Sequence, residues 1–172
     1  MVDEPIPVPG LTIHKLVTHV DPRGSLFEVF NPSWGLTAMH QWTAMTLARR
    51  ALRGPSVHRR HTDAVVALEG EMSVGLRDLR ERSPVFRRPF RVTLSSRVPT
   101  LLVIPPGVMH AFHAPHGPAL VMVGGSFAYD PDDDIKCRSQ DAALDLDPSD
   151  IGLEDGRARS LEDVIAALRA TA

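Results

Sequence analysis

The stretch "VIPPGVMHAF" at residues 103–112 decides the fold of this chain. An apolar run ends in Pro105, Pro106 and Gly107, and a second apolar run that contains His110 follows directly. Prolines beside a glycine favour a tight turn, and short apolar runs bounded by such turns are typical of β-strands. The stretch therefore predicts one strand, a sharp turn and a second strand that carries His110.

Short β-rich segments bounded by Gly, Pro, Asp or Ser continue on both sides of this turn. Residues 91–95, "RVTLS", alternate apolar and polar side chains, whereas "AVVAL" (64–68) and "LLVI" (101–104) are continuous apolar runs typical of strands buried on both faces. Many short strands with no long amphipathic helix among them indicate an all-β sandwich or barrel. The 172 residues suffice for one domain with a sizeable core.

The two ends of the chain differ in composition from the β-rich segments between them. Residues 1–10 are rich in proline and predict an extended arm before a barrel at 11–130. Residues 131–172 begin as an acidic, turn-rich segment and end in "SLEDVIAALRATA", where the apolar spacing and a capping box of Ser160 with Asp163 predict a short C-terminal helix. The acidic residues 130–134 are expected to form a solvated turn.

Charge and composition exclude several classes of partner. The chain has 19 basic and 21 acidic residues, a formal net charge of -2, which lacks the basic surplus of a nucleic-acid-binding domain. No apolar run reaches membrane-spanning length, and the N-terminus lacks the pattern of a signal peptide. The single cysteine excludes an internal disulfide and a Cys-rich zinc site. We expect a cytoplasmic protein that binds neither nucleic acid nor membrane.

Residues that can carry chemistry gather in "RGPSVHRRHTD" (53–63), a charged loop before the apolar run at 64–68. An acid–base site, a metal site and a solvated loop all remain open for it. His58 acting as a general base requires a carboxylate that orients its ring. His61 and Asp63 share strand parity and can face the same way, although a position at the rim is the simpler expectation for His61.

These two stretches resemble the two sequence motifs of the cupin barrels. The Pro/Gly turn followed by His110 matches the second motif, and Asp63 with Gly70 matches the end of the first. His58 occupies the place of the first motif's second histidine, and Ser56 occupies the place of its first. The resemblance implies a cupin-type jelly-roll β-barrel. It also leaves open, as an alternative, one divalent transition metal held by His58, Asp63 and His110.

A longer resemblance, to the dTDP-4-dehydrorhamnose 3,5-epimerase family, covers roughly residues 11–140. It rests on "DPRGSLFEVF" (21–30), "RG" (53–54), "LEGEMSVGLRDLRERSPVF" (68–86), "VIPPGVMHAF" (103–112) and "YDPDDDI" (129–135). The resemblance implies a homodimer that exchanges strands and binds a nucleotide-linked keto sugar without a metal or other cofactor. It implies that a histidine–aspartate pair removes a proton beside a C4 ketone while a tyrosine reprotonates the opposite face.

The family resemblance also implies a set of site residues. The catalytic candidates are His58, His110 and Asp163, the last because "RSLED" is similar to a late stretch of the family, with helix capping as its alternative role. The residues implied to bind substrate are Arg23, Glu28, Gln41, Arg53, His61 and Asp134. Arg23 and Arg53 would contact the diphosphate, Arg23 from the neighbouring subunit.

Several positions depart from the family pattern. Ser56 stands at the place of the base histidine, Val123 at that of the catalytic tyrosine, and Thr43 replaces an asparagine. Asp63 replaces a lysine and would repel a diphosphate. Tyr129 is the only tyrosine and therefore the only phenol available for proton transfer.

These departures leave three functions open. The first is an epimerase-like enzyme of deoxysugar or secondary-metabolite biosynthesis with altered or reduced chemistry, in which a single epimerisation with reprotonation by solvent is expected. The second is a metal-dependent cupin enzyme. The third is a cupin that binds a sugar nucleotide without catalysis.

Overall fold

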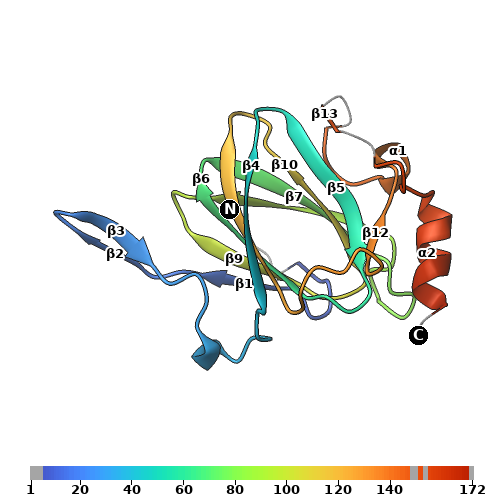
Figure 1. Ribbon diagram of the computed structural model, residues 1–172, viewed down its shortest axis with the longest axis horizontal. Coiled ribbons are helices and arrows are strands. Elements are labelled where there is room, and N and C mark those ends of the chain that lie inside the picture. Colours follow the sequence, from blue (N-terminus) through green and yellow to red (C-terminus); the bar gives the residue numbers. More distant parts are fainter. Residues whose placement is uncertain (1–5, 148–150, 153–154, 171–172) are drawn as a thin grey trace.

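Two facing β-sheets form the body of the molecule, which a computed structural model describes over residues 6–147, 151–152 and 155–170 (Figure 1). The first sheet has five strands in the order β1-β9-β6-β11-β4. Its strands are β1 Thr12–Lys15, β4 Gln41–Leu47, β6 Asp63–Glu69, β9 Thr100–Ile104 and β11 Ala119–Gly125. The predicted all-β fold of cupin type is confirmed.

The second sheet has six strands, in the order β12-β5-β10-β7-β8 with β13 also paired to β5. Its strands are β5 Ala51–His58, β7 Glu71–Asp78, β8 Pro89–Ser95, β10 Val108–His113, β12 Asp134–Lys136 and β13 Ile151–Gly152. The turn at 105–107 joins β9 of the first sheet to β10 of the second, so the stretch that predicted a strand pair also connects the two sheets.

The main core fills the space between the sheets. Because side chains alternate along a strand, Val65 and Ala67 of β6 enter this core while Ala64 and Val66 pack on the outer face. Both faces of β6 are therefore covered, as its continuous apolar run predicted. Asp63 has the same parity as Val65, which turns its carboxylate toward the barrel interior.

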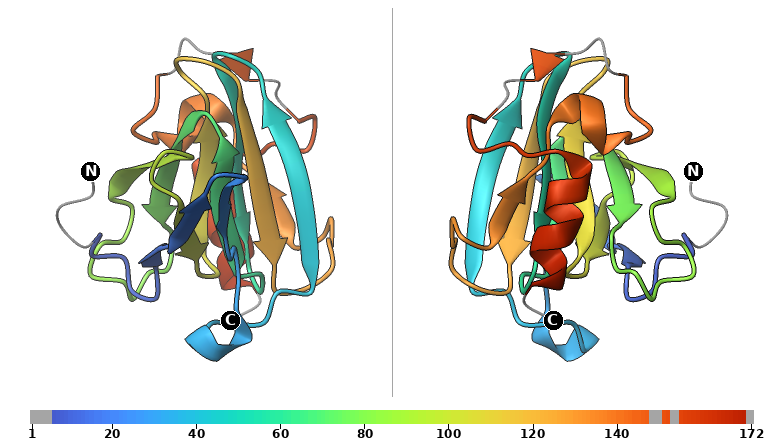
Figure 2. Two further views of the ribbon diagram at one scale, coloured as in Figure 1. Left: turned by 90° about the vertical axis from the view of Figure 1, so that its left-hand side faces the viewer. Right: turned by 90° about the vertical axis from the view of Figure 1, so that its right-hand side faces the viewer.

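Helices α1 (Ser139–Ala142) and α2 (Leu161–Arg169) cover the outer face of the six-stranded sheet (Figure 2). Val164 and Ile165 of α2 belong to the same buried cluster as Val57 of β5. The Oγ of Ser160 accepts a hydrogen bond from the backbone N–H of Asp163 at 3.2 Å, which confirms the predicted cap. Within the described part of the chain, no helix combines the length and apolar character needed to cross a membrane.

A hairpin of β2 (Thr18–Asp21) and β3 (Gly24–Phe27) projects away from the body (Figure 1). The 3-10 helix η1 (Pro32–Trp34) follows it and leads to β4. Val20 and Leu26 of the hairpin are 76% and 61% exposed although both are large and apolar. The hairpin therefore gains little burial from its own chain.

Two connecting stretches differ from the sequence expectation. The region predicted as a charged loop is strand β5 as far as His58, because it pairs with β10 on one edge and with β12 on the other. Residues 59–62 alone form the turn to β6. Residues 1–5 of the predicted N-terminal arm lie outside the described residues, and Val8 is buried in the main core.

Candidate active site

Polar side chains from four strands meet inside one end of the barrel. His58 ends β5, Asp63 begins β6, His110 lies in β10 and Asp134 begins β12. The strand register pairs His110 with Ser56, and Asp134 with His58, so these side chains share the inward face of the sheet. Strand pairing thus brings together His58, Asp63 and His110, which the cupin resemblance grouped.

The two imidazole rings face the same carboxylate oxygen. Nε2 of His58 lies 3.6 Å, and Nε2 of His110 lies 3.9 Å, from Oδ2 of Asp63. Both separations exceed hydrogen-bond length, so these contacts are electrostatic. All three side chains are at most 14% exposed, which weakens screening by water.

Burial governs the ionisation of this group. Burial lowers the pKa of His58 against the opposing charge of Asp63, and it raises the pKa of Asp63 against the charge of His58. Burial also lowers the pKa of His110 to about 4. Both rings are therefore neutral near pH 7 and each has a nitrogen lone pair that can accept a proton or another electrophile.

The tautomer of His110 is fixed by a backbone carbonyl. Its Nδ1 lies 3.2 Å from the oxygen of Val108, and because a carbonyl only accepts, Nδ1 carries the hydrogen. In the neutral ring the lone pair is then on Nε2, which points toward Asp63 rather than offering an N–H to a substrate. This orientation argues against His110 as a hydrogen-bond donor to a ketone oxygen.

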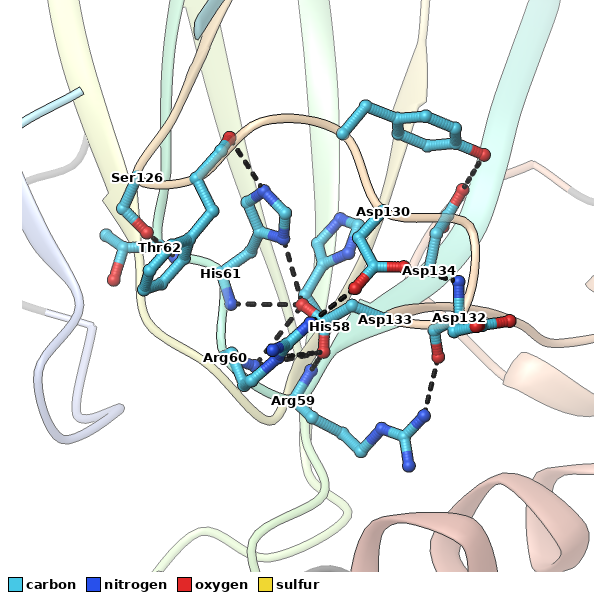
Figure 3. A network of polar contacts seen from close by, with 12 residues as sticks. His58, Arg59, Arg60, His61, Thr62, Ser126, Asp130, Asp132, Asp133 and Asp134 are labelled. Carbon is cyan, nitrogen blue, oxygen red and sulfur yellow. Dashed lines mark hydrogen bonds and ion pairs between the residues drawn. The ribbon is translucent and has the colours of Figure 1, made fainter. Parts of the chain in front are cut away.

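Asp133 anchors the turn between β5 and β6. Its carboxylate is 1% exposed and accepts hydrogen bonds from the backbone N–H groups of Arg59, Arg60 and His61 (Figure 3). His61 donates from Nδ1 to Asp133 at 2.9 Å and from Nε2 to the carbonyl of Phe127 at 3.0 Å. Because both partners only accept, both ring nitrogens carry hydrogens and His61 is a cation. Burial lowers the pKa of His61, but these two bonds outweigh it and raise the pKa.

This network corrects two expectations from the sequence. Residues 130–134 were expected to be a solvated turn, whereas Asp133 and Asp134 are buried. His61 was expected at the rim and as a substrate contact, whereas it is 6% exposed and both of its nitrogens are engaged. The partners His61 and Asp133 lie 72 positions apart, so local sequence carries no trace of their pairing.

A cavity of about 400 Å³ opens beside His110. This volume falls within the range of small-molecule sites. Its lining includes three cationic side chains, Arg53, Lys136 and Arg157. Two carboxylates also line it, and they pair with Lys136 (Asp134, 2.7 Å) and with Arg157 (Asp155, 3.0 Å). The three cations exceed the two carboxylates by one, so the lining has a small excess of positive charge that suits a phosphorylated ligand.

Of the predicted residues, Asp134 lines this cavity and Gln41 contacts Tyr129 at its edge. Asp134 forms an ion pair with Lys136 at 2.7 Å and accepts a hydrogen bond from the Tyr129 hydroxyl at 3.3 Å. The Oε1 of Gln41 accepts from the backbone N–H of Tyr129 at 2.7 Å. Sequence reasoning assigned no role to Lys136 or Arg157, because β12 is only three residues long and the segment around Arg157 matches no motif.

The positions that depart from the family pattern also face inward. Ser56 is buried on β5 beside His110, and Val123 packs against the main core from β11. Thr43 is the register partner of Val123 on β4. A serine, a valine and a threonine cannot carry out the proton chemistry of an imidazole or a phenol at these positions.

Three predicted site residues lie elsewhere in the single chain. Arg23 is at the tip of the projecting hairpin, paired with Asp21 at 2.6 Å, and Glu28 is exposed just after that hairpin. Asp163 is exposed at the first turn of α2, outside the sheet, where it contacts Ser160. The structure therefore supports the capping role of Asp163 and does not bring it to His58.

Comparison with known proteins gives one family. The sequence profile of dTDP-4-dehydrorhamnose 3,5-epimerase matches residues 5–163. A comparison with curated proteins gave no match.

Solved structures share the fold across nearly the whole chain. The RmlC epimerase of Mycobacterium tuberculosis is 26% identical with a TM-score of 0.84, over 95% of this chain and 90% of that chain. ChmJ, a 3'-monoepimerase from Streptomyces bikiniensis in complex with dTDP-quinovose, is 20% identical with a TM-score of 0.82, over 97% and 89%. NovW, a 4-keto-6-deoxy sugar epimerase from Streptomyces spheroides, is 21% identical with a TM-score of 0.79, over 97% and 88%.

Proposed function

This chain belongs to the dTDP-4-dehydrorhamnose 3,5-epimerase family, and we propose that it is a carbohydrate epimerase acting next to the ketone of a dTDP-linked 4-keto-6-deoxy sugar. The observation that carries the proposal is the buried imidazole–carboxylate pair of His58 and Asp63, which lies beside His110, a residue that lines the cavity together with Arg53, Lys136 and Arg157. Proton abstraction beside a ketone requires a neutral base and a positive partner for the enolate oxygen. We propose that His58 supplies the base and that a cationic side chain of the cavity supplies the partner.

His58 is the proposed proton acceptor. Its lowered pKa keeps the ring neutral at physiological pH, and Asp63 at 3.6 Å stabilises the imidazolium that proton abstraction creates. The ammonium of Lys136 is the proposed electrostatic partner of the enolate oxygen, because it lines the cavity, where Asp134 holds it at 2.7 Å.

Two changed positions lead us to propose a single epimerisation. Ser56 and Val123 stand where the family resemblance places a base and an acid, and neither exchanges a proton near neutral pH. We propose that solvent returns the proton and that exchange occurs at one carbon beside the ketone, in deoxysugar or secondary-metabolite biosynthesis.

The cationic wall of the cavity is the proposed diphosphate site. Replacing Arg53 by alanine is expected to weaken dTDP binding about 10- to 100-fold, because a charge-assisted hydrogen bond contributes roughly 1.5–3 kcal/mol. Isothermal titration calorimetry with dTDP measures this, and the exposed neighbour Arg49→Ala is the matched control. Equal affinity of Arg53→Ala and wild type would remove Arg53 from the site.

A homodimer is part of the proposal, because the projecting hairpin exposes Val20 and Leu26 and carries Arg23 away from its own cavity. Sedimentation is expected to give a dimer for the wild type and a monomer for a Val20→Asp, Leu26→Asp variant, since buried aspartates would carry an uncompensated charge. A wild-type monomer at micromolar concentration would contradict this part.

Deuterium exchange tests the function itself. Incubation of a dTDP-4-keto-6-deoxy sugar with the protein in D₂O is expected to replace the proton at one carbon beside the ketone. Binding of the sugar without exchange would instead support a non-catalytic binding protein.

A nucleotide-linked substrate is charged and does not cross membranes unaided, so the proposal includes a cytoplasmic location.

A further inference from the structure

We propose that His58, Asp63 and His110 form a binding site for one divalent first-row transition metal ion. The inference goes beyond the proposed function and does not rest on it. Two imidazole nitrogens and one carboxylate oxygen are the donor set that holds zinc or ferrous iron with open coordination positions. One donor atom from each side chain lies within 4.8 Å of the other two.

The separations of the donor atoms fit a shared ion better than mutual hydrogen bonds. Atoms bound to one ion at about 2.1 Å lie roughly 3.0–3.6 Å apart when the angle between them is about 90–120°. The His58–Asp63 separation of 3.6 Å lies at the edge of this range, and the His110–Asp63 separation of 3.9 Å exceeds it by a few tenths of an ångström. A small side-chain movement therefore closes the site.

The orientation of His110 supplies an independent argument. Its Nδ1 donates to the carbonyl of Val108, which is the outer contact that metal-binding histidines normally make. Its Nε2 lone pair then faces the Asp63 carboxylate inside the barrel, which places two electron-rich atoms opposite each other. A cation between them would be bound by both atoms.

A second group of potential ligands, His58 with His61 and Asp133, is already engaged. Both nitrogens of His61 donate hydrogen bonds, and the Asp133 carboxylate accepts from the backbone of the 59–61 turn. Releasing these atoms would break the anchor between two loops. The ion is therefore assigned to the group that contains Asp63 and His110.

The sequence departures agree with this assignment. Asp63 stands where the family resemblance implies a lysine, so one substitution removes a cation and supplies the carboxylate ligand. An ion bound here polarises a ketone oxygen as a Lewis acid. If the metal ion is bound, Nε2 of His58 coordinates it and cannot accept a proton. Metal binding and proton abstraction by His58 therefore exclude each other.

Metal titration of the full-length protein decides the question. Protein stripped with a chelator is titrated with Zn²⁺ by calorimetry and with Co²⁺ by visible absorption. We expect one equivalent to bind to the wild type. Binding is expected to weaken at least about 100-fold in Asp63→Asn and in His110→Gln, since loss of an outer contact alone costs 10- to 100-fold. The exposed His116→Gln is the matched control and should bind like the wild type.

Two results would overturn the proposal. One is failure of the wild type to bind one equivalent of either metal, with the stripped protein shown to be folded by circular dichroism. The other is full binding by His110→Gln, which would move the ion to the group around His61. Exchange activity measured with and without chelator is read separately: activity of the stripped protein supports the acid–base function, whatever the titration shows.

Discussion

Replacing Asp133 by alanine is expected to lower the free energy of unfolding by about 3–5 kcal/mol, the cost of removing one partner from a buried ion pair. The carboxylate is 1% exposed and satisfies three backbone N–H groups and the His61 imidazolium. Its loss leaves these donors without their acceptor, and those of His61 are buried. Equilibrium unfolding in urea measures the change, with the exposed neighbour Asp132→Ala as the matched control.

The contribution of Asp133 to the free energy of unfolding is expected to depend on pH. Burial raises the pKa of Asp133, but the bonds from His61 and the backbone of 59–61 outweigh it and hold the pKa below 3.8. Its stabilisation is therefore present at neutral pH and lost as pH falls through the lowered pKa. His61 has a raised pKa, so its contribution is lost as pH rises through that value. The difference between wild type and Asp133→Asn should thus be largest between about pH 4 and the raised pKa of His61. A difference that does not vary with pH would contradict the charged pair.

Replacing His58 by alanine is expected to slow deuterium exchange beside the ketone by at least about 100-fold, the lower end of a general base's contribution. Affinity for dTDP should stay unchanged, because His58 is not among the residues that line the cationic cavity. Proton NMR of the sugar in D₂O measures the exchange, and calorimetry measures the affinity.

Asp163→Ala is the control that shows whether Asp163 has a catalytic role or only caps helix α2. The family resemblance implies that Asp163 completes a catalytic pair, whereas the structure places it on the exposed first turn of α2. We expect its replacement to leave the exchange rate unchanged. An equal loss in Asp163→Ala and His58→Ala would restore the catalytic pair.

The fold and the place of the pocket could be predicted from the sequence because their signals are local. The turn at 105–107, the apolar run of β6 and the cap at Ser160 each depend on neighbouring residues. The spacing from Asp63 to Gly70 likewise located one wall of the site. Departures such as Val123 were also visible, since a single position of a known pattern was changed.

The rest depended on contacts between distant parts of the chain. β5 looked like a charged loop because its partners β10 and β12 lie more than 50 and 70 positions further on. Asp133 looked solvated because acidic runs usually are, and its burial arises from a turn 72 positions away. Lys136 and Arg157 reach the cavity through a short strand and an irregular segment, neither of which has a sequence signature.

The most direct measurement of the central claim is the time course of proton NMR for dTDP-4-keto-6-deoxyglucose incubated with the wild-type protein in D₂O. We predict that one of the two protons beside the ketone, at C3 or C5, is replaced by deuterium and that His58→Ala slows this exchange at least about 100-fold. No exchange at either carbon, from a folded protein that binds dTDP, would contradict it.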